Sequence, residues 1–170
     1  MSKAKTSSSR RWLSRQHSDI YILRAKNEGY RSRSAYKLLE LQEKDKLLRP
    51  GMAVIDLGAA PGGWSQVVAE IIGQTGYLIA LDILTMEPLS NVDILEGDFR
   101  EPAILKLLMD RLENKLGKDK DNKLIDLVIS DMAPNLSGMS VIDQPRSILL
   151  AELALELSTS VLKKRGSFIG

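Results

Sequence analysis

A glycine-rich turn between an apolar run and an amphipathic run constrains the fold of this 170-residue chain more than any other feature. The apolar run covers residues 52–57, the turn covers residues 58–63, and the amphipathic run covers residues 66–72. This order predicts a buried strand, a tight turn and the beginning of a helix. Glycine allows positive φ and the close approach of a ligand, and the free amide groups of the first helical turn face whatever the turn holds. The stretch therefore predicts a binding site for a small molecule.

Two nucleotide-binding motifs can be compared with this turn. The phosphate loop of nucleoside triphosphatases has the pattern G-x-x-x-x-G-K-[ST], and Gly58, Gly63 and Ser65 fit it. Its lysine is replaced by Trp64, so no cation would neutralise a triphosphate, and hydrolysis of nucleoside triphosphates is disfavoured. The dinucleotide pattern G-x-G-x-x-G fails because Ala60 stands at its second glycine, which disfavours NAD. The turn instead predicts a nucleoside ligand that carries little negative charge.

Composition limits the class of protein. With 170 residues, of which 44% are hydrophobic and 27% charged, we expect one globular domain over residues 18–170, preceded by a flexible arm over residues 1–17. The chain has no cysteine and a single histidine, His17, so we expect neither a disulfide nor a metal site. No apolar run approaches the roughly 18 residues of a membrane span, and the N-terminus lacks the apolar core of a signal peptide. We therefore expect a cytoplasmic monomer that does not contact a membrane.

The N-terminal part of the chain is strongly basic. Residues 1–37 contain ten Lys or Arg and two acidic residues, so their net charge is +8; because the whole chain carries +2, residues 38–170 carry −6. A basic segment on an acidic body predicts a polyanionic partner such as RNA, since contacts from Lys and Arg to phosphate release counterions. A solvated tail without a partner is the alternative that the charges leave open. The candidate RNA contacts are Arg10, Arg11, Arg15, Arg31, Arg33 and Lys37.

Strand and helix patterns alternate along the chain. Apolar runs predict strands over residues 53–57, 77–82, 92–96, 124–130 and 167–169, the last of which has barely begun when the chain ends. Helical spacing predicts helices over residues 18–27, 31–47, 66–72, 103–116 and 144–163. This alternation predicts an α/β fold with a parallel, doubly wound sheet and right-handed crossovers.

Four aspartates end or follow the predicted strands: Asp56, Asp82, Asp98 and Asp131. In parallel α/β sheets, ligands bind beyond the carboxyl ends of the strands, where the strand order reverses. A single aspartate in such a place is often only a turn residue, but four at equivalent strand ends indicate a shared site. Asp82 comes 26 positions after Asp56, near the spacing at which an acid accepts both ribose hydroxyls. The predicted cavity therefore suits a nucleoside.

Four motifs together resemble one family. They cover residues 31–38, 56–66, 96–99 and 130–135, and the resemblance extends from about Trp12 to Ile169. The chain resembles the FtsJ/RrmJ (RlmE) family of ribosomal RNA 2′-O-ribose methyltransferases, which use S-adenosylmethionine. The resemblance implies a Rossmann-like methyltransferase fold and methylation of large-subunit (23S) ribosomal RNA during ribosome biogenesis. It also implies that the partner is ribosomal RNA or the large ribosomal subunit.

The resemblance implies cofactor contacts by motif position. Gly62 and Trp64 fall at the methionine end of S-adenosylmethionine, Asp82 at the ribose, and Asp98 with Phe99 near the adenine. Asp131 falls between the cofactor and the substrate. The candidate cofactor set is Asp56, Gly58, Pro61, Gly62, Gly63, Trp64, Asp82, Asp98, Phe99 and Asp131.

The family's catalytic set is similar to Lys-Asp-Lys-Glu, and Lys37 and Asp131 match its first two members. Methyl transfer to a ribose hydroxyl is an in-line displacement on an activated methyl group, so alignment supplies much of the rate. A lysine suits the remaining task, which is to remove or share the hydroxyl proton. The second lysine would be the residue after Gly170, and the glutamate and last strands would lie further on. We therefore expect a C-terminally incomplete enzyme that binds the cofactor but transfers far less methyl than a chain extended past Gly170.

Three other functions stay open at this point. A non-catalytic RNA-binding module would explain the basic segment and the absent second lysine, but not four carboxylates around a nucleoside-sized cleft. A small-molecule methyltransferase would share the cofactor turn, but it has no need of the basic segment. A methyltransferase of exocyclic amines would need [DN]-P-P-[YF] after the fourth strand, where the chain has Asp131-Met132-Ala133-Pro134.

Overall fold

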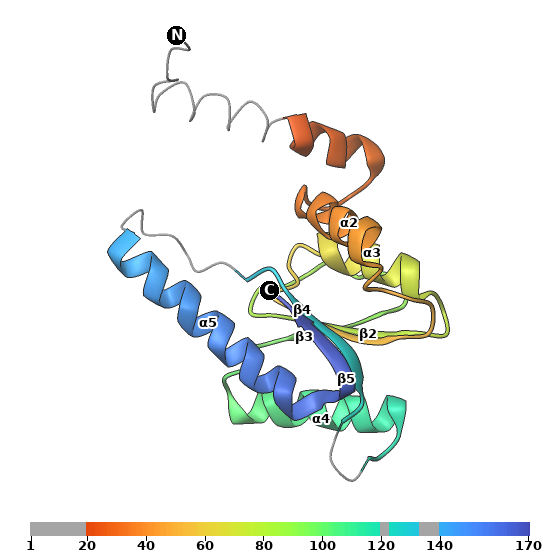
Figure 1. Cartoon of the computed structure of the whole chain (residues 1–170), viewed down its shortest axis with the longest axis vertical. Helices are drawn as coiled ribbons and strands as arrows, with labels where there is room; N and C mark the ends of the chain where they lie inside the picture. The colour runs from red at the N-terminus through yellow and green to blue at the C-terminus, as the bar shows by residue number, and fades with distance from the viewer. Residues whose placement is uncertain (1–19, 120–122, 133–139) are drawn as a thin grey trace.

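The computed structural model describes residues 20–119, 123–132 and 140–170, and it shows alternating helices and strands (Figure 1). After a first helix over residues 20–28, the elements in chain order are α2 (Ser34–Asp45), β1 (Ala53–Leu57), α3 (Gly63–Ile72), β2 (Tyr77–Asp82), β3 (Val92–Glu96), α4 (Pro102–Leu116), β4 (Ile125–Ser130), α5 (Ser140–Val161) and β5 (Leu162–Ile169). The first three strands have the bounds that the apolar runs predicted. The predicted α/β class is confirmed.

The five strands form one parallel sheet in the order β3-β2-β1-β4-β5. The chain first builds outward from β1 through β2 to β3, and it then crosses to the other side of β1 to form β4 and β5. The strand order therefore reverses between β1 and β4, which is where sheets of this kind hold their ligands. Almost all residues of β1, β2 and β4 are buried, because helices cover both faces of the sheet's centre.

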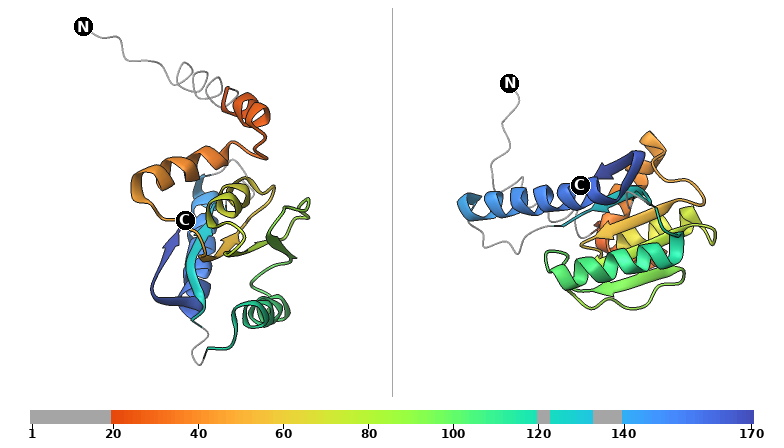
Figure 2. Two further views of the ribbon diagram at one scale, coloured as in Figure 1. Left: turned by 90° about the vertical axis from the view of Figure 1, so that its right-hand side faces the viewer. Right: turned by 90° about the horizontal axis from the view of Figure 1, so that it is seen from below.

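Two helices cover each face of the sheet (Figures 1 and 2). α2 and α3 pack on one face through apolar side chains such as Leu38, and α4 and α5 pack on the other through side chains such as Leu108. The helix over residues 20–28 lies beyond α2, where Tyr36 Oη donates a hydrogen bond of 2.8 Å to Glu28. The two cores hold the carboxyl ends of the strands in fixed positions relative to one another.

The last helix and the last strand differ from their predicted bounds. The helix predicted over residues 144–163 is observed as α5, Ser140–Val161. The strand predicted over residues 167–169 is observed as β5, Leu162–Ile169, and is therefore longer than expected.

The extra length of β5 contains an irregular stretch. Leu162 pairs with Ile125 and Ser167 pairs with Leu127, so the residues between Leu162 and Ser167 bulge out of the ladder. Their sequence, Lys163-Lys164-Arg165-Gly166, has no apolar alternation, and the prediction failed for this reason. Within this stretch, Lys163 Nζ forms an ion pair of 2.8 Å with Asp126 Oδ1 of β4.

Part of the predicted RNA-binding segment lies outside the described residues. This applies to the arm over residues 1–17 and to Arg10, Arg11 and Arg15 within it. In the ranges that the structure does describe, no helix is long and apolar enough to cross a membrane.

Candidate active site

A cavity of about 340 Å³ lies beyond the carboxyl ends of β1, β2, β3 and β4. This volume falls in the range of small-molecule sites, which is about 300–1,000 Å³. The segments that follow the four strands supply most of the wall. Five of the predicted cofactor residues line the cavity: Gly58, Asp82, Asp98, Phe99 and Asp131. Three of the four predicted aspartates, Asp82, Asp98 and Asp131, therefore lie in one wall, whereas Asp56 does not line the cavity.

Asp82 is the last residue of β2, and its carboxylate is held by two backbone amides. Ala60 N–H donates to Oδ2 at 2.9 Å, and Leu84 N–H donates to Oδ1 at 2.8 Å. A carboxylate oxygen has two lone pairs, so each oxygen can accept a second hydrogen bond from a ligand. The arrangement suits two adjacent hydroxyl groups, because both oxygens are fixed in the wall of the cavity.

Asp98 and Phe99 follow β3 on the next part of the wall. Arg100 binds the Asp98 carboxylate through Nε and Nη2 at 2.5 to 2.9 Å, and these hydrogen bonds hold the pKa of Asp98 below its ordinary value. Phe99 is buried and also lines the cavity. An aromatic face beside a neutralised carboxylate suits a flat ligand group without charge.

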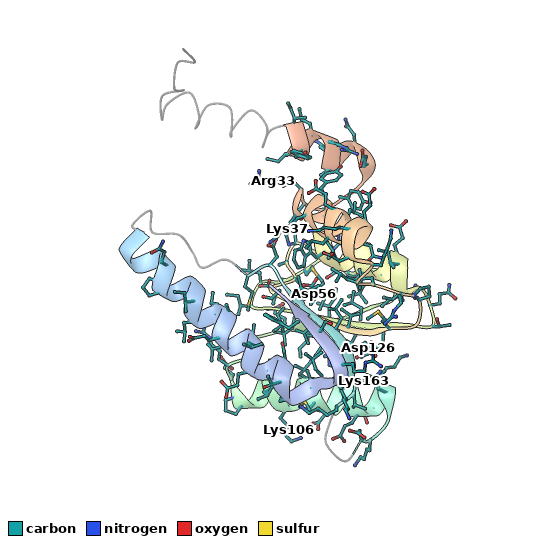
Figure 3. The ribbon with its side chains drawn as sticks, viewed as in Figure 1. Arg33, Lys37, Asp56, Lys106, Asp126 and Lys163 are labelled. Atoms are coloured by element: carbon teal, nitrogen blue, oxygen red, sulfur yellow. The ribbon has the colours of Figure 1, made fainter. Side chains whose placement is uncertain are left out.

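Lys37 and Asp131 form an ion pair at the same edge of the sheet. Lys37 Nζ donates to Asp131 Oδ1 at 2.9 Å, and the two side chains are 57% and 35% exposed. Asp131 follows β4 and lines the cavity, whereas Lys37 comes from α2 on one face of the sheet (Figure 3). The pair therefore connects the cavity with a surface that a macromolecule can reach.

Trp64 packs beneath this lysine. Its side chain is only 3% exposed, and its Nε1–H donates to the carbonyl oxygen of Ser34 at 2.8 Å. Lys37 Nζ lies 5.2 Å from the centroid of the Trp64 ring, within the range of a cation–π contact. The residue that replaces the phosphate-loop lysine thus ties α3 to α2 and supports Lys37.

Asp56 lies within β1 and is fully buried, and Figure 3 shows it near the middle of the sheet. Ser65 Oγ donates to Asp56 Oδ2 at 2.6 Å. Burial raises the pKa of Asp56 to about 7; the Ser65 hydrogen bond opposes the rise, while Asp131 and Asp82 add to it. Ser65 lies in the first part of α3, directly after the glycine turn. The hydrogen bond from Ser65 to Asp56 therefore ties the end of the turn to β1.

The three glycines of the turn serve different purposes. Gly58 and Gly62 have φ values of +74° and +107°, which L side chains rarely adopt. Gly63 instead is the first residue of α3, and a Cβ there would clash with Ser32 Oγ. Glycine is needed at position 63 because another part of the chain packs on it. Positive φ therefore explains the glycines at positions 58 and 62 but not the one at position 63.

Two of the predicted RNA contacts lie just before or at the start of α2. Arg33 immediately precedes α2 and is exposed, as Figure 3 shows. Arg31 turns toward the glycine turn, where Nη1 donates to the Pro61 carbonyl at 3.3 Å. Nη1 also donates to the Glu87 carbonyl at 2.6 Å, and Nη2 donates to the Pro88 carbonyl at 2.7 Å.

The residues of the cavity wall that sequence reasoning did not assign to the cofactor include Ile83, Leu84, Arg100 and Leu150. Ile83 and Leu84 directly follow Asp82, so their place after a strand end was a usable signal. Both are 63% exposed, which is unusual for adjacent apolar side chains in a cavity wall. Leu150 comes from α5, and nothing in its local sequence indicates that α5 reaches this cavity.

The charges of the wall indicate the kind of ligand. Its described residues include three carboxylates and one guanidinium, and the guanidinium is engaged by Asp98. Such a wall repels phosphate and favours hydroxyl groups or a cation. Among residues 20–119, 123–132 and 140–170, no group of three or more acidic or histidine side chains is arranged to hold a metal ion.

Comparisons with known proteins agree with this geometry. Residues 30–170 match the protein family described as FtsJ-like methyltransferase. A protein of Alkalilimnicola ehrlichii named ribosomal RNA large subunit methyltransferase E is 55% identical over 161 residues, which cover 95% of this chain and 73% of that protein. A protein of Hahella chejuensis with the same name is 50% identical over 169 residues, which cover 99% of this chain and 77% of that protein.

A solved structure has a similar fold. The crystal structure of a Plasmodium falciparum protein described as a ribosomal RNA methyltransferase superposes with a TM-score of 0.70 at 28% sequence identity. The superposition covers 82% of this chain and 77% of that chain.

Proposed function

The chain belongs to the FtsJ-like methyltransferase family, and on that basis we propose that it methylates a ribose 2′-hydroxyl of large-subunit ribosomal RNA. The protein is therefore an enzyme, and its role lies in ribosome biogenesis. The relatives named as methyltransferases of the large ribosomal subunit support the choice of RNA. One feature of the structure carries the proposal: the ion pair of Lys37 and Asp131 stands beside a cavity suited to a nucleoside.

The proposed methyl donor is S-adenosylmethionine. Asp82 would accept the two ribose hydroxyls, since both of its oxygens are fixed by backbone amides. Phe99 would pack against the adenine, and Asp131, which belongs to the same wall, would lie near the sulfonium. When bound, the donor supplies an activated methyl group. Asp56 and the glycine turn would act indirectly, by holding the wall in place.

Lys37 and Asp131 would handle the proton of the attacking hydroxyl. As an ammonium, Lys37 Nζ can donate a hydrogen bond to the ribose oxygen and so orient a lone pair toward the methyl group. To take the hydroxyl proton, Nζ must first lose a proton of its own, for which Asp131 and solvent are both within reach. Asp131 Oδ1 holds the amine in place in either state.

The RNA would approach from the side of α2. Lys37 and Arg33 are exposed there, close to the cavity edge. The candidate contacts Arg10, Arg11 and Arg15 precede this surface in the sequence, and their charges would add sequence-independent affinity for phosphate. We also propose that the enzyme is a cytoplasmic monomer, because its substrate is ribosomal and one chain supplies both members of the proposed catalytic pair.

A methyl-transfer assay tests this proposal. Methyl-labelled S-adenosylmethionine would be incubated with the chain and with large ribosomal subunits or their RNA. We expect label in nucleotides that resist alkaline hydrolysis, because a 2′-O-methyl group removes the hydroxyl that alkali needs. Binding of S-adenosylhomocysteine would be measured in parallel by calorimetry. Label in methylated bases, or binding of NAD without binding of S-adenosylhomocysteine, would refute the proposal.

A further inference from the structure

Arg31 joins two loops that lie far apart in the sequence. Its guanidinium donates to the carbonyl oxygen of Pro61 in the glycine turn and to the carbonyl oxygens of Glu87 and Pro88 in the loop after β2. The distances are 3.3, 2.6 and 2.7 Å. A guanidinium has five N–H donors in a rigid plane, so one arginine can bind several carbonyl groups at fixed separations.

The two loops form adjacent walls of the cavity. Pro61 follows Ala60, and the loop that contains Glu87 begins with Ile83 and Leu84; all three of these neighbours line the cavity. Asp82 links the same two walls from inside, since it accepts hydrogen bonds from the amides of Ala60 and Leu84. Arg31 and Asp82 therefore both join the glycine turn to the loop after β2: Asp82 does so from the cavity wall, and Arg31 does so from the segment before α2.

The packing around Gly62 shows how closely Arg31 approaches the turn. A Cβ on Gly62 would lie 3.2 Å from both Cδ and Nη1 of Arg31, and 3.0 Å from Met86 Sδ. Both distances are tighter than ordinary contacts of Cβ atoms. The absence of a side chain at Gly62 thus leaves room for both Arg31 and Met86, which belongs to the loop after β2.

The backbone of Arg31 is held as well. Its amide donates to Gln66 Oε1 at 2.7 Å, and Gln66 Nε2 donates to the Gly29 carbonyl at 3.0 Å. Gln66 belongs to α3, so the segment before α2 is fixed on the helix that follows the glycine turn. This segment leads within a few residues to Lys37 on α2.

We propose that Arg31 is a positioning residue for the cofactor pocket: it sets the separation of the glycine turn and the loop after β2, and it fixes both relative to Lys37. This inference rests on the proposed function, because it assumes that the cavity binds S-adenosylmethionine. It gives Arg31 a different role from Arg33, although both are arginines of one basic segment. Loss of Arg31 should weaken binding of the cofactor, whereas loss of Arg33 should weaken binding of RNA.

Three variants that each lose one positive charge distinguish a role in cofactor binding from a role in RNA binding. We expect Arg31→Ala to weaken S-adenosylhomocysteine binding by about 10- to 100-fold, as for lost hydrogen bonds of a charged group. The KM for S-adenosylmethionine should rise more than kcat falls. Arg33→Ala should instead lower RNA affinity and flatten its salt dependence. Arg49→Ala, an exposed arginine beyond the other end of α2, controls for the loss of positive charge.

A rescue experiment distinguishes positioning from general destabilisation. Guanidinium ion at tens of millimolar should restore part of the S-adenosylhomocysteine affinity of Arg31→Ala, because the ion can occupy the vacated place among the three carbonyls. The same ion should not restore the affinity of Asp82→Ala. Arg31→Lys keeps the charge but cannot span three carbonyls, so its affinity should lie between those of the wild type and Arg31→Ala.

The outcomes separate this inference from the function on which it rests. Failure of the wild-type protein to bind S-adenosylhomocysteine would refute the proposed function. If the wild type binds and Arg31→Ala binds equally well while losing RNA affinity, Arg31 is an RNA contact and the inference is overturned. If Arg31→Ala does not fold, wild-type affinity in folded Arg31→Lys overturns it in the same way.

Discussion

The ammonium nitrogen of Lys37 lies 2.9 Å from Asp131 Oδ1, although the two residues are 94 positions apart in the sequence. Lys37 comes from α2 and Asp131 directly follows β4, so the pair forms only when α2 has packed on the sheet that contains β4. Trp64 supports the lysine from below through a cation–π contact. This relationship places a proton-handling group at the edge of the nucleoside cavity.

Replacement of Lys37 should lower the rate of catalysis and leave cofactor binding intact. We expect Lys37→Ala to lower the rate of methyl transfer by about 10²- to 10⁴-fold, the usual contribution of a general acid or base. Asp131→Asn should have a smaller effect, because the amide can still accept a hydrogen bond from Nζ. The measurement is labelled methyl transfer beside S-adenosylhomocysteine calorimetry. Lys44→Ala, on the same helix, is the matched control, and equal rates for Lys37→Ala and Lys44→Ala would rule out the assigned role.

Asp82 should control affinity for the nucleoside part of the cofactor. Asp82→Ala removes the acceptors of two hydroxyl groups, and hydrogen bonds to charged groups contribute about 1.5–3 kcal/mol. We therefore expect the Kd of S-adenosylhomocysteine to rise by about 10- to 100-fold. Adenosine should lose affinity by a similar factor, whereas 2′-deoxyadenosine should lose less. An unchanged Kd for adenosine would place the ribose elsewhere.

The buried carboxyl of Asp56 should make stability depend on pH. Its pKa is raised from an ordinary value near 3.8 to about 7, so between these values the folded state holds a proton that the unfolded state has lost. The free energy of unfolding should therefore fall as pH rises from about 4 to 7. Three pKa units correspond to about 4 kcal/mol.

Asp56→Asn isolates this effect, because asparagine resembles the neutral carboxyl and does not ionise. Relative to the wild type, the variant should gain stability progressively from pH 4 to pH 8, as measured by urea unfolding at each pH. Asp98 contributes in the opposite sense, since its lowered pKa makes stability fall only in acid, below about pH 4. A constant difference between the wild type and Asp56→Asn across this range would show that Asp56 is ionised when folded.

The exposed cations near α2 should contribute to RNA binding through phosphate contacts. We expect Arg33→Ala to reduce the slope of log K against log salt concentration by about 1, and to weaken binding to different RNA sequences by similar factors. Filter binding at several salt concentrations measures both quantities. A sequence-selective loss with an unchanged slope would indicate a base contact instead.

Gly63 should tolerate no side chain unless Ser32 changes as well. A Cβ at position 63 would clash with Ser32 Oγ and would lie 3.2 Å from Ser32 Cβ. We expect Gly63→Ala to lower the free energy of unfolding by about 1–3 kcal/mol, as overpacked sites do. In the double variant with Ser32→Ala, part of that loss should be recovered, which a thermal unfolding series can test. Additive losses would contradict the packing at this site.

Local sequence predicted much of the fold because its signals act over short distances. β1 and β2 are buried on both faces, so nearly all of their residues are apolar. The ends of the apolar runs therefore predicted the ends of the strands. Asp82, Asp98 and Asp131 could be assigned to one cavity because parallel strands place their carboxyl ends at one edge, whereas Asp56 lies within β1 and is buried. The irregular stretch of β5 was missed, because residues 163–166 have no apolar alternation and Lys163 is held by Asp126, which lies 37 positions away in the sequence.

The sequence by itself determined the α/β class, the glycine turn and the family resemblance, because these depend on periodicity and on short motifs. Only the tertiary structure decided which arginine of the basic segment binds the loops of the cavity and why glycine is required at each position of the turn. Arg31 binds three carbonyls from two loops, and Gly63 is fixed by Ser32. These contacts join residues about 30 to 57 positions apart, and the packing of α2 against α3 brings the segment before α2 onto the glycine turn.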